Sequence, residues 1–228
     1  MREAGRSRNV KAAVRQSPNR RERRKLATRQ ALIDATHDLL ASRSMDALSV
    51  DEIAMRADVA KGTFYNYFAD KDALAREIAS DARTRIENQI TRANQGINDP
   101  AERIGRAFCC AVSLALGAPK QAAATMRLFP HALDPSAPIN SGVCRDVAEG
   151  VAQGRIVAQS EDVAIACIVG VFIAGVNRVL DLPTDRARGF AQELGTILLH
   201  GLGLSRARAA RIMRDAVESI LIEAKKEH

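Results

Sequence analysis

The fold of this chain is decided by the stretch SVDEIAMRADVAKGTFYNYFADK, which runs from Ser49 to Lys71. Ser49 with Glu52 three residues later is the pattern of a capping box, in which two side chains satisfy backbone N–H groups at the start of a helix. The short helix opened by this box is followed by a turn at 58–60 and a second short helix over 61–68. This spacing is typical of a helix-turn-helix, whose second helix can enter the major groove of DNA.

The second helix has a composition that a DNA-facing surface explains better than a bundle core. A glycine near its start lets the backbone approach a phosphate, and the helix N-terminus is itself an anion site. Its hydroxyl groups can donate to phosphates, while a lysine and an asparagine are types that read guanine and adenine edges. Phe64 and Phe68 are expected to face inward, and the alternative for the whole segment is a Tyr-rich helix packed inside a bundle. The DNA-facing residues expected here are Lys61, Gly62, Thr63, Tyr65, Asn66 and Tyr67.

Helical patterns continue on both sides of this stretch. From about Arg20, apolar residues spaced three to four apart predict a helix that ends near 42–44. Asp70 is expected to cap a long helix whose apolar face comprises Leu74, Ile78, Ala82, Ile86 and Ile90. Residues 1–19 show no periodicity, so we expect a disordered basic arm. The chain then divides into this arm at 1–19, a DNA-binding domain at 20–70, a linking helix at 71–95 and a second domain at 96–228.

The second domain, 96–228, is expected to be helical throughout. Gly96 ends the long helix, and Asp99, Pro100 and Glu102 have the order of an N-cap, a first-turn proline and a first-turn acid. No segment alternates like a strand, and the low aromatic content of 4% also favours helices. The fold class is therefore all-α, with helices expected over roughly 100–117, 120–129, 137–153, 161–181, 185–201 and 206–224.

The positive charge of the chain is concentrated at its start. Residues 1–30 carry 11 Lys and Arg against 2 Asp and Glu, whereas residues 31–95 carry 8 against 11 and residues 96–228 carry 15 against 14. A basic arm of this kind favours a polyanionic partner, with nucleic acid the leading candidate. The alternatives are a solvated leader and an organelle transit peptide. The helix-turn-helix that begins soon after the arm favours DNA.

Other classes of protein have little support in the sequence. The longest apolar run, 163–176, is shorter than the roughly 18–20 residues that span a bilayer, so we expect a buried helix and no membrane partner. We find no phosphate loop, nucleophile elbow or carboxylate pair at catalytic spacing, so we expect neither an enzyme nor a cofactor. The four cysteines show no metal-ligand spacing, and reduced thiols are expected. A thiol sensor at Cys109 and Cys110 is the alternative to small buried side chains.

From about Arg29 to Leu74 the sequence resembles the tetracycline-repressor (TetR) family, above all in "SVDEIA", "VAKGTFYNYF" and the lysine at Lys71. Ser44 and Asp58 stand where the family usually has glycine, and Leu40 where it usually has phenylalanine. The resemblance implies a three-helix DNA-binding domain, a linking helix, and a helical C-terminal domain that dimerises and holds a small-molecule pocket. By position, the residues of the second helix given above, together with Lys71, would contact DNA.

Two of these positions carry particular expectations. Lys71 would meet a phosphate, so its replacement by alanine should lower the salt dependence of DNA binding by about one unit. Val50 stands where the family often presents a hydroxyl to phosphate, and Ser49 could take that contact, although its capping role competes.

The apolar helix over 163–176 is expected to have two faces with different roles. One face would line the pocket and the other would form a dimer seam; the alternative is a plain core helix in a monomer. The pocket candidates, for which core packing is the alternative, are Phe108, Met126, Phe129, Cys144, Phe172 and Asn177. The seam candidates are Ala166, Gly170, Ala174, Leu194, Ile197 and Leu198.

These patterns favour a bacterial, cytoplasmic, nucleoid-associated transcriptional repressor. Its expected partners are double-stranded operator DNA, a small-molecule effector and a second copy of the chain. An enzyme with a helical pocket is disfavoured by the missing motifs. A helical adaptor that binds DNA without regulating it would differ from a repressor in its indifference to small molecules.

Overall fold

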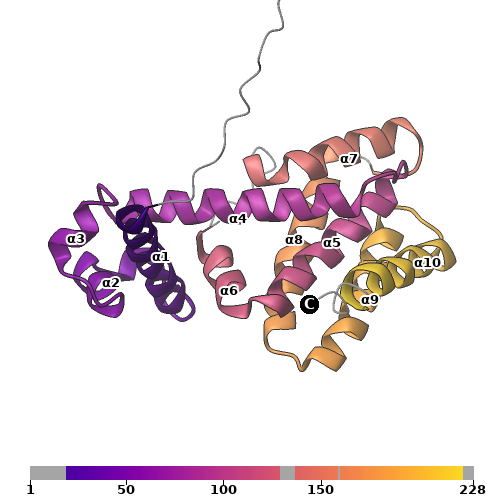
Figure 1. Cartoon of the computed structure of the whole chain (residues 1–228). Coiled ribbons are helices and arrows are strands. Elements are labelled where there is room, and N and C mark those ends of the chain that lie inside the picture. The colour runs from indigo at the N-terminus through magenta and orange to yellow at the C-terminus, as the bar shows by residue number, and fades with distance from the viewer. Residues whose placement is uncertain (1–18, 129–136, 159, 223–228) are drawn as a thin grey trace, which may run out of the picture.

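The all-α prediction is confirmed by the computed structural model, which describes residues 19–128, 137–158 and 160–222. Within these residues every regular element is helical, and the helices form a small N-terminal lobe and a larger C-terminal lobe (Figure 1). Residues 1–18 of the arm expected at 1–19, and the candidate Phe129, lie outside the described residues, while Asn19 is described as the N-cap of α1. The helices are α1 (Arg20–Leu40), α2 (Val50–Arg56), α3 (Lys61–Tyr65), α4 (Lys71–Ala93), α5 (Pro100–Gly117), α6 (Pro119–Leu128), α7 (Ser141–Ala152), α8 (Glu161–Leu180), α9 (Thr184–Gly201) and α10 (Arg206–Val217).

Short elements complete this order. Two 3₁₀ turns, η1 (Met45–Ala47) and η2 (Pro138–Asn140), precede α2 and α7, and a π-helical turn, η3 (Glu218–Ile222), follows α10. Most bounds of the long helices agree with the sequence pattern to within about two residues, but α7 begins at Ser141 rather than 137, after η2, and α10 ends at Val217, where η3 takes over, rather than at 224. The second short helix ends earlier than expected, at Tyr65, because Asn66 forms its C-cap.

The N-terminal lobe is held together by one apolar core. α1, α2, α3 and the first turns of α4 each contribute fully buried side chains, among them Leu32, Ile53, Phe64 and Leu74. Asp58, in the turn between α2 and α3, has a φ of 54°, a left-handed conformation that Asp adopts more readily than most residues. Aspartate therefore fills the position at which the family usually has glycine.

The C-terminal lobe is built around α5. Ile104, Phe108, Cys109 and Cys110 of this helix are all buried, beneath α4, α7, α8, α9 and α10. By length and composition, α8 is also apolar enough to cross a membrane. Packing of α8 on α5, α7 and α9 accounts for part of this apolar character.

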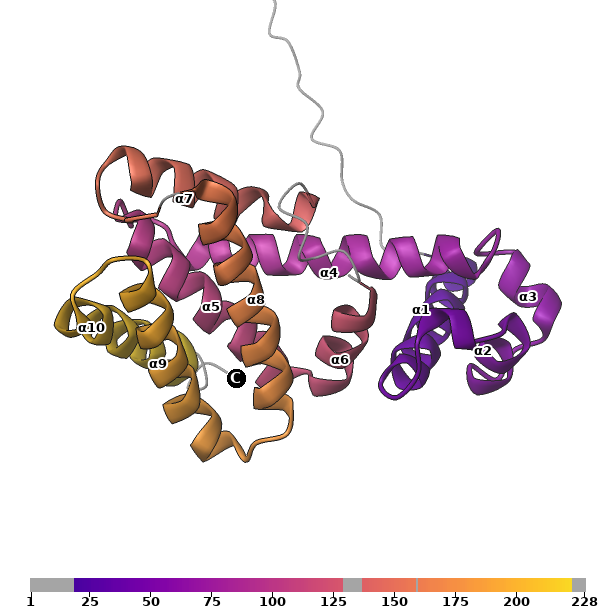
Figure 2. The ribbon, with the colours of Figure 1, turned by 180° about the vertical axis from the view of Figure 1, so that it is seen from behind.

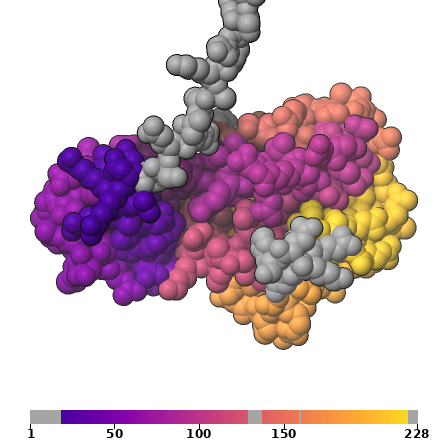
Figure 3. All heavy atoms as spheres, viewed as in Figure 1, coloured from indigo at the N-terminus to yellow at the C-terminus, as the bar shows by residue number. Residues whose placement is uncertain are grey.

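α4 and α6 connect the two lobes. α4 runs from the N-terminal lobe along the C-terminal lobe, and α6 lies in the space between α1 and the C-terminal lobe, as both ribbon views show (Figures 1 and 2). Ala124 of α6 is fully buried in the core of the N-terminal lobe. On the surface, Asp38 of α1 accepts hydrogen bonds from Arg56 of α2 at 2.6 Å and from Lys120 of α6 at 2.8 Å. The surface view shows the small lobe as a rounded body beside α6 (Figure 3).

Candidate nucleic-acid interface and internal cavity

The α2–turn–α3 unit presents one polar face to solvent. Lys61, Gly62, Tyr65 and Asn66 are exposed, with Tyr65 at 51%, while Thr63 and Tyr67 are half-buried. On the opposite side, Phe64 and Phe68 are buried as expected, with ring centroids 5.7 Å apart. These two rings anchor a helix of only five residues, which would not be stable on its own. Four of the six residues of this segment expected to face DNA are therefore exposed, while Thr63 is half-buried and Tyr67 packs against the N-terminal core.

Lys61 and Ser49 already have partners in the free protein. The Lys61 ammonium donates to Asp51 at 2.8 Å, and this hydrogen bond raises the pKa of Lys61, so that the side chain stays charged. The Ser49 hydroxyl accepts from the Glu52 N–H and donates to the Glu52 carboxylate at 2.9 Å, completing the expected capping box. A phosphate contact by the Ser49 hydroxyl would have to displace this cap, and it stays a prediction.

Glu52 ties the start of α2 to the preceding loop. Its carboxylate accepts from Arg43 at 2.7 Å and from the Ser49 N–H at 2.9 Å. The hydrogen bond from Arg43 is the largest cause, and that from the Ser49 backbone the next, of a fall in the pKa of Glu52 to about 2. The N-terminus of α2 is therefore organised by an ionised carboxylate.

Lys71 differs from its sequence expectation. Its ammonium donates to three backbone carbonyls, those of Met45 at 3.2 Å, Asp46 at 3.1 Å and Leu48 at 3.2 Å. An ammonium has three N–H donors, so these carbonyls occupy its whole donor capacity. The geometry gives Lys71 the role of fixing η1 and the loop before α2, rather than that of a free phosphate contact.

Basic side chains also line the start of α1. Arg20, Arg21, Arg24 and Lys25 are exposed on its first turns. Asn19 and Glu22 form a capping box that begins the helix, and the spacing of these two residues is a sequence signal for that start. Part of the basic excess assigned to the N-terminal arm is thus carried on an ordered helix.

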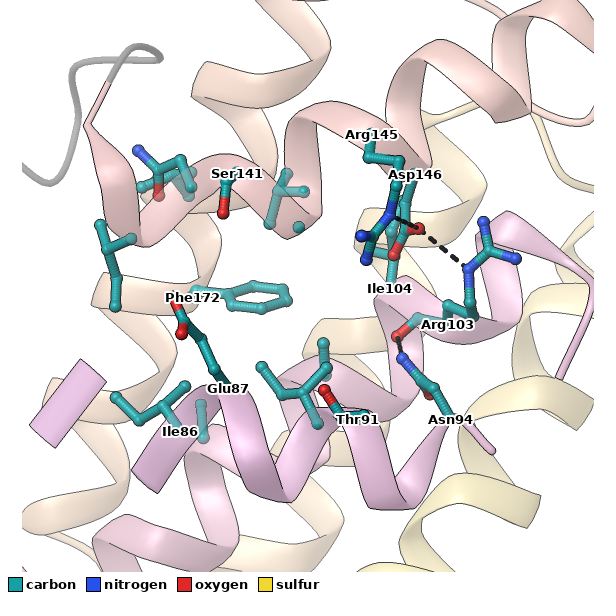
Figure 4. Close-up of a pocket in the computed structure, with 18 of the residues that line it drawn as sticks. Ile86, Glu87, Thr91, Asn94, Arg103, Ile104, Ser141, Arg145, Asp146 and Phe172 are labelled. Atoms are coloured by element: carbon teal, nitrogen blue, oxygen red, sulfur yellow. Dashed lines mark hydrogen bonds and ion pairs between the residues drawn. The ribbon is translucent and has the colours of Figure 1, made fainter. Parts of the chain in front are cut away.

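The C-terminal lobe contains a cavity of about 700 Å³, within the range of small-molecule sites. Figure 4 shows side chains from α4, α5, α7 and α8 converging on it. Most of the wall is apolar, and polar groups gather toward the C-terminal end of α4, the start of α5 and α7. The apolar lining comprises Ile86, Ile90, Ile104, Ala107, Ala111, Met126, Ile139, Val143, Val169, Phe172, Ile173 and Val176.

Arg103 organises the polar end of the cavity. Its guanidinium donates to Asp146 at 2.9 Å and to Glu149, and its backbone carbonyl accepts from the Asn94 amide at 3.3 Å. The Arg103 and Asp146 side chains are only 14% and 8% exposed. Burial raises the pKa of Asp146, against the opposing effect of Arg103. This ion pair links α5 to α7 across 43 residues of sequence, which is why no local pattern revealed it.

The pocket candidates from the sequence are only partly brought together. Met126 and Phe172 line the cavity. Phe108 is fully buried behind the wall, with its ring 5.2 Å from that of Phe172. Cys144 is half-buried on α7 and Asn177 is exposed on α8, and neither lines the cavity. Periodicity identified these helices but not the faces that they turn to the cavity.

Sequence reasoning also missed lining residues that carried a signal. Ile86 and Ile90 were placed on the apolar face of the long helix, without a role in the pocket, and both line the cavity. Their position on that apolar face, beyond the residues that fill the N-terminal core, was the signal.

The seam candidates are only partly at the surface, because Leu198 belongs to the core of the C-terminal lobe and Leu194 packs against it. Ala166, Ala174 and Ile197 are exposed, Gly170 and Leu194 are half-buried, and Leu198 is buried. Val163 is 67% and Ile197 68% exposed, which is unusual for large aliphatic side chains.

Cys109 and Cys110 offer little reactivity, since burial raises the pKa values of both thiols to about 12. In the described ranges no cluster of three or more His, Cys, Asp or Glu could hold a metal ion.

Two family profiles match the chain in succession. The profile "Bacterial regulatory proteins, tetR family" matches residues 32–78. The profile "Tetracyclin repressor-like, C-terminal domain" matches residues 99–215, more than half of the chain.

Individual proteins give a consistent picture. The HTH-type transcriptional repressor KstR of Rhodococcus jostii (strain RHA1) is 36% identical over 48% of this chain and 61% of the relative. The uncharacterised HTH-type regulator YdeS of Bacillus subtilis (strain 168) is 43% identical over 21% of this chain and 24% of the relative. The chain thus matches less than two thirds of the length of these curated relatives.

Solved structures resemble both lobes. A gamma-butyrolactone receptor described as ArpA-like has a TM-score of 0.66 at 19% identity, covering 86% of this chain and 98% of that one. RolR in complex with the ligand resorcinol has a TM-score of 0.52 at 25% identity, covering 84% and 95%.

Proposed function

The chain belongs to the tetracycline-repressor (TetR) family of bacterial regulatory proteins, and we propose that it is a sequence-specific DNA-binding repressor released from its operator by a small-molecule effector. The observation that carries DNA binding is the outer face of α3, where the polar side chains of a helix-turn-helix are exposed above two buried phenylalanines. Arg and Lys on the first turns of α1 add sequence-independent attraction to phosphates. In a bacterium this protein would act in the cytoplasm, at the nucleoid.

The cavity is the proposed effector site, and α4 and α6 are its connections to the DNA-binding lobe. α4 supplies Ile86 and Ile90 to the wall and Leu74 to the core of the N-terminal lobe. α6 supplies Met126 to the wall and Ala124 to that same core. A ligand that moves either wall would therefore shift a helix that the DNA-binding lobe packs against. Such coupling is typically about 1–3 kcal/mol and is reciprocal.

The exposed apolar face of α8 and α9 is proposed to bind a second copy of the chain. In a single copy of the chain only 39% of the apolar stretch of α8 is buried, and Val163 and Ile197 remain largely exposed. A twofold dimer through this face would cover them and hold two α3 helices at a fixed separation. Matching half-sites would lie about 34 Å apart, one turn of DNA.

Selection of bound fragments from genomic DNA, followed by footprinting, tests this proposal. We expect a palindromic site protected by a dimer, and light scattering should give a mass near twice 24.7 kDa. Neighbouring genes would suggest effectors, and operator DNA should weaken effector affinity by the factor with which effector weakens DNA binding. Equal effector affinity with and without operator would exclude the release mechanism, and a monomer mass would exclude the dimer.

A further inference from the structure

The cavity wall limits the shape of what it can hold. Apolar side chains from α4, α5, α6 and α8 form most of it, with Arg103, Arg145 and Asp146 together at one end and Glu87 apart from them beside Phe172 (Figure 4). A volume of about 700 Å³ accepts a molecule of drug size with a mainly apolar body. The few charged residues that line the cavity must then decide which polar group such a ligand carries.

Arg103 is unavailable to a ligand carboxylate. All three of its guanidinium nitrogens donate to protein acceptors, namely Asp146, Glu149 and the carbonyls of Ile97 and Asn98. A buried guanidinium with two carboxylate partners offers little further attraction to an anion, because its charge is already compensated. The most buried cation of the wall therefore acts within the protein.

Glu87 is in the opposite situation. Figure 4 shows its carboxylate directed into the cavity beside the Phe172 ring. Arg83 on the same helix forms an ion pair with it, with Arg83 Nε 3.6 Å from Glu87 Oε1, which is too long for a hydrogen bond, and the Glu87 side chain is 49% exposed. An ionised carboxylate accepts hydrogen bonds and cannot donate them. The group that Glu87 would receive from a ligand is thus a donor.

From this arrangement we propose that the effector is a mainly apolar molecule whose polar end, a hydroxyl or a protonated amine, donates to Glu87, and that it carries no anionic group. The inference rests on the proposed function, because it takes the cavity as the effector site. Phe172 would favour an amine further, since a cation beside an aromatic face is attracted to the ring.

The charge balance of the wall supports the exclusion of anions. Among the described residues of the wall, three carboxylates, Glu87, Asp146 and Glu149, face two guanidinium groups, Arg103 and Arg145, and Arg83 pairs with Glu87 from outside the wall. Arg145 is 76% exposed and lies 3.9 Å from Asp146, so its attraction for a ligand anion is screened by solvent. A carboxylate or phosphate ligand would gain little from either cation, and Glu87, which is 49% exposed and paired with Arg83, would offer it no attraction.

Three probes of one chain length, 1-decanol, decylamine and decanoate, separate these chemistries at neutral pH. Binding is measured by displacement of Nile red, a neutral dye that fluoresces in apolar surroundings; the chain has no Trp to interfere. We expect decylamine and decanol to displace the dye at concentrations at least about tenfold lower than decanoate. Ala111→Phe, which fills the cavity from α5, should abolish the dye signal and so locate it, with circular dichroism checking that the variant is folded.

Glu87→Gln and Asp81→Asn form the matched pair. Each removes one exposed carboxylate from α4, but only Glu87 lines the cavity. Glu87→Gln should weaken the binding of decylamine by about tenfold and tighten the binding of decanoate. Asp81→Asn should leave the order of affinities of the three probes unchanged. Equal changes in the two variants would show a general charge effect and overturn the role of Glu87.

The outcomes distinguish this inference from the proposed function. Decanoate binding as tightly as the amine would overturn the ligand class, while release of operator DNA by any probe would still support an effector site. The expected order without operator release would support the ligand class and contradict the release mechanism. Failure of dye and all three probes to bind, in protein that still binds operator, would overturn both the ligand class and the effector role of the cavity.

Discussion

The α2–α3 unit and the cavity are built by different kinds of interaction. In α2–α3, the capping box, the left-handed turn and the two anchoring phenylalanines all lie within Ser49–Phe68. The cavity takes its wall from five helices, between Ile86 and Val176. The comparison teaches that a DNA-reading surface can be specified by a short run of residues, whereas a binding cavity is specified by how distant helices pack.

The largest difference is expected between two phenylalanine truncations. Phe64→Ala removes a fully buried ring from the N-terminal core and should lower the free energy of unfolding by about 3–5 kcal/mol. Phe172→Ala removes a half-buried ring from a wall that already borders empty space, and should cost about 1 kcal/mol. Urea unfolding followed by circular dichroism measures both. Similar losses for the two variants would mean that the cavity wall is packed as tightly as the N-terminal core.

Lys71→Met tests a residue that sequence and structure interpret differently. Methionine keeps the aliphatic stem but loses the hydrogen bonds to three carbonyls, so the protein should lose about 2 kcal/mol of stability. The salt dependence of operator binding, measured as the slope of the logarithm of the binding constant against the logarithm of the salt concentration, should stay unchanged. A slope lower by about one unit, with unchanged stability, would restore the phosphate contact expected from the sequence.

Glu52→Gln tests the electrostatics of the α2 cap. The pKa of Glu52 is lowered to about 2 from the usual 4.5, so its ionised form stabilises the fold above pH 4.5, and this contribution is lost as pH falls toward 2. Glutamine cannot ionise. The stability gap between the native chain and the variant should therefore be greatest above pH 5 and shrink steadily toward pH 2. A gap independent of pH would show that the Glu52 charge has no part in capping.

The smallest effect is expected at the surface link between the lobes. Asp38→Asn weakens the pairs with Arg56 and Lys120, and because these are exposed the melting temperature should change little. Effector-driven release of operator should change by about threefold, since Asp38 joins α6 to the DNA-binding lobe. Asp34→Asn, an exposed change on the same helix, is the control. An equal response from both variants would remove Asp38 from the coupling.

The sequence predicted those features whose partners are near neighbours. The Ser49–Glu52 box, the Asp70 cap and the inward phenylalanines follow from spacings of three and four residues, and the structure has all of them. The C-terminal helices were also found, because proline, glycine and polar caps mark their ends.

The pocket residues could be predicted only in part. Periodicity shows that α5 and α8 are apolar, but a helix that is apolar on most sides gives no sign of which side borders a cavity. Phe172 therefore lines the wall while Phe108 lies buried behind it and Asn177 faces outward. Glu87 was not expected, since an exposed glutamate on a polar face carries no signal until α7 and α8 are placed opposite it.

By itself the sequence determined an all-α chain with a helix-turn-helix and its inward-facing phenylalanines, because capping, turn geometry and amphipathic spacing act over a few residues. Tertiary structure alone decided that Lys71 is occupied by backbone carbonyls, that Arg103 is neutralised by two carboxylates of α7, and that Glu87 points into a cavity. Each of these depends on groups brought together from distant parts of the chain. Whether an ionic or polar side chain is paired or left free depends on the groups around it, and the packing of the helices decides which groups those are.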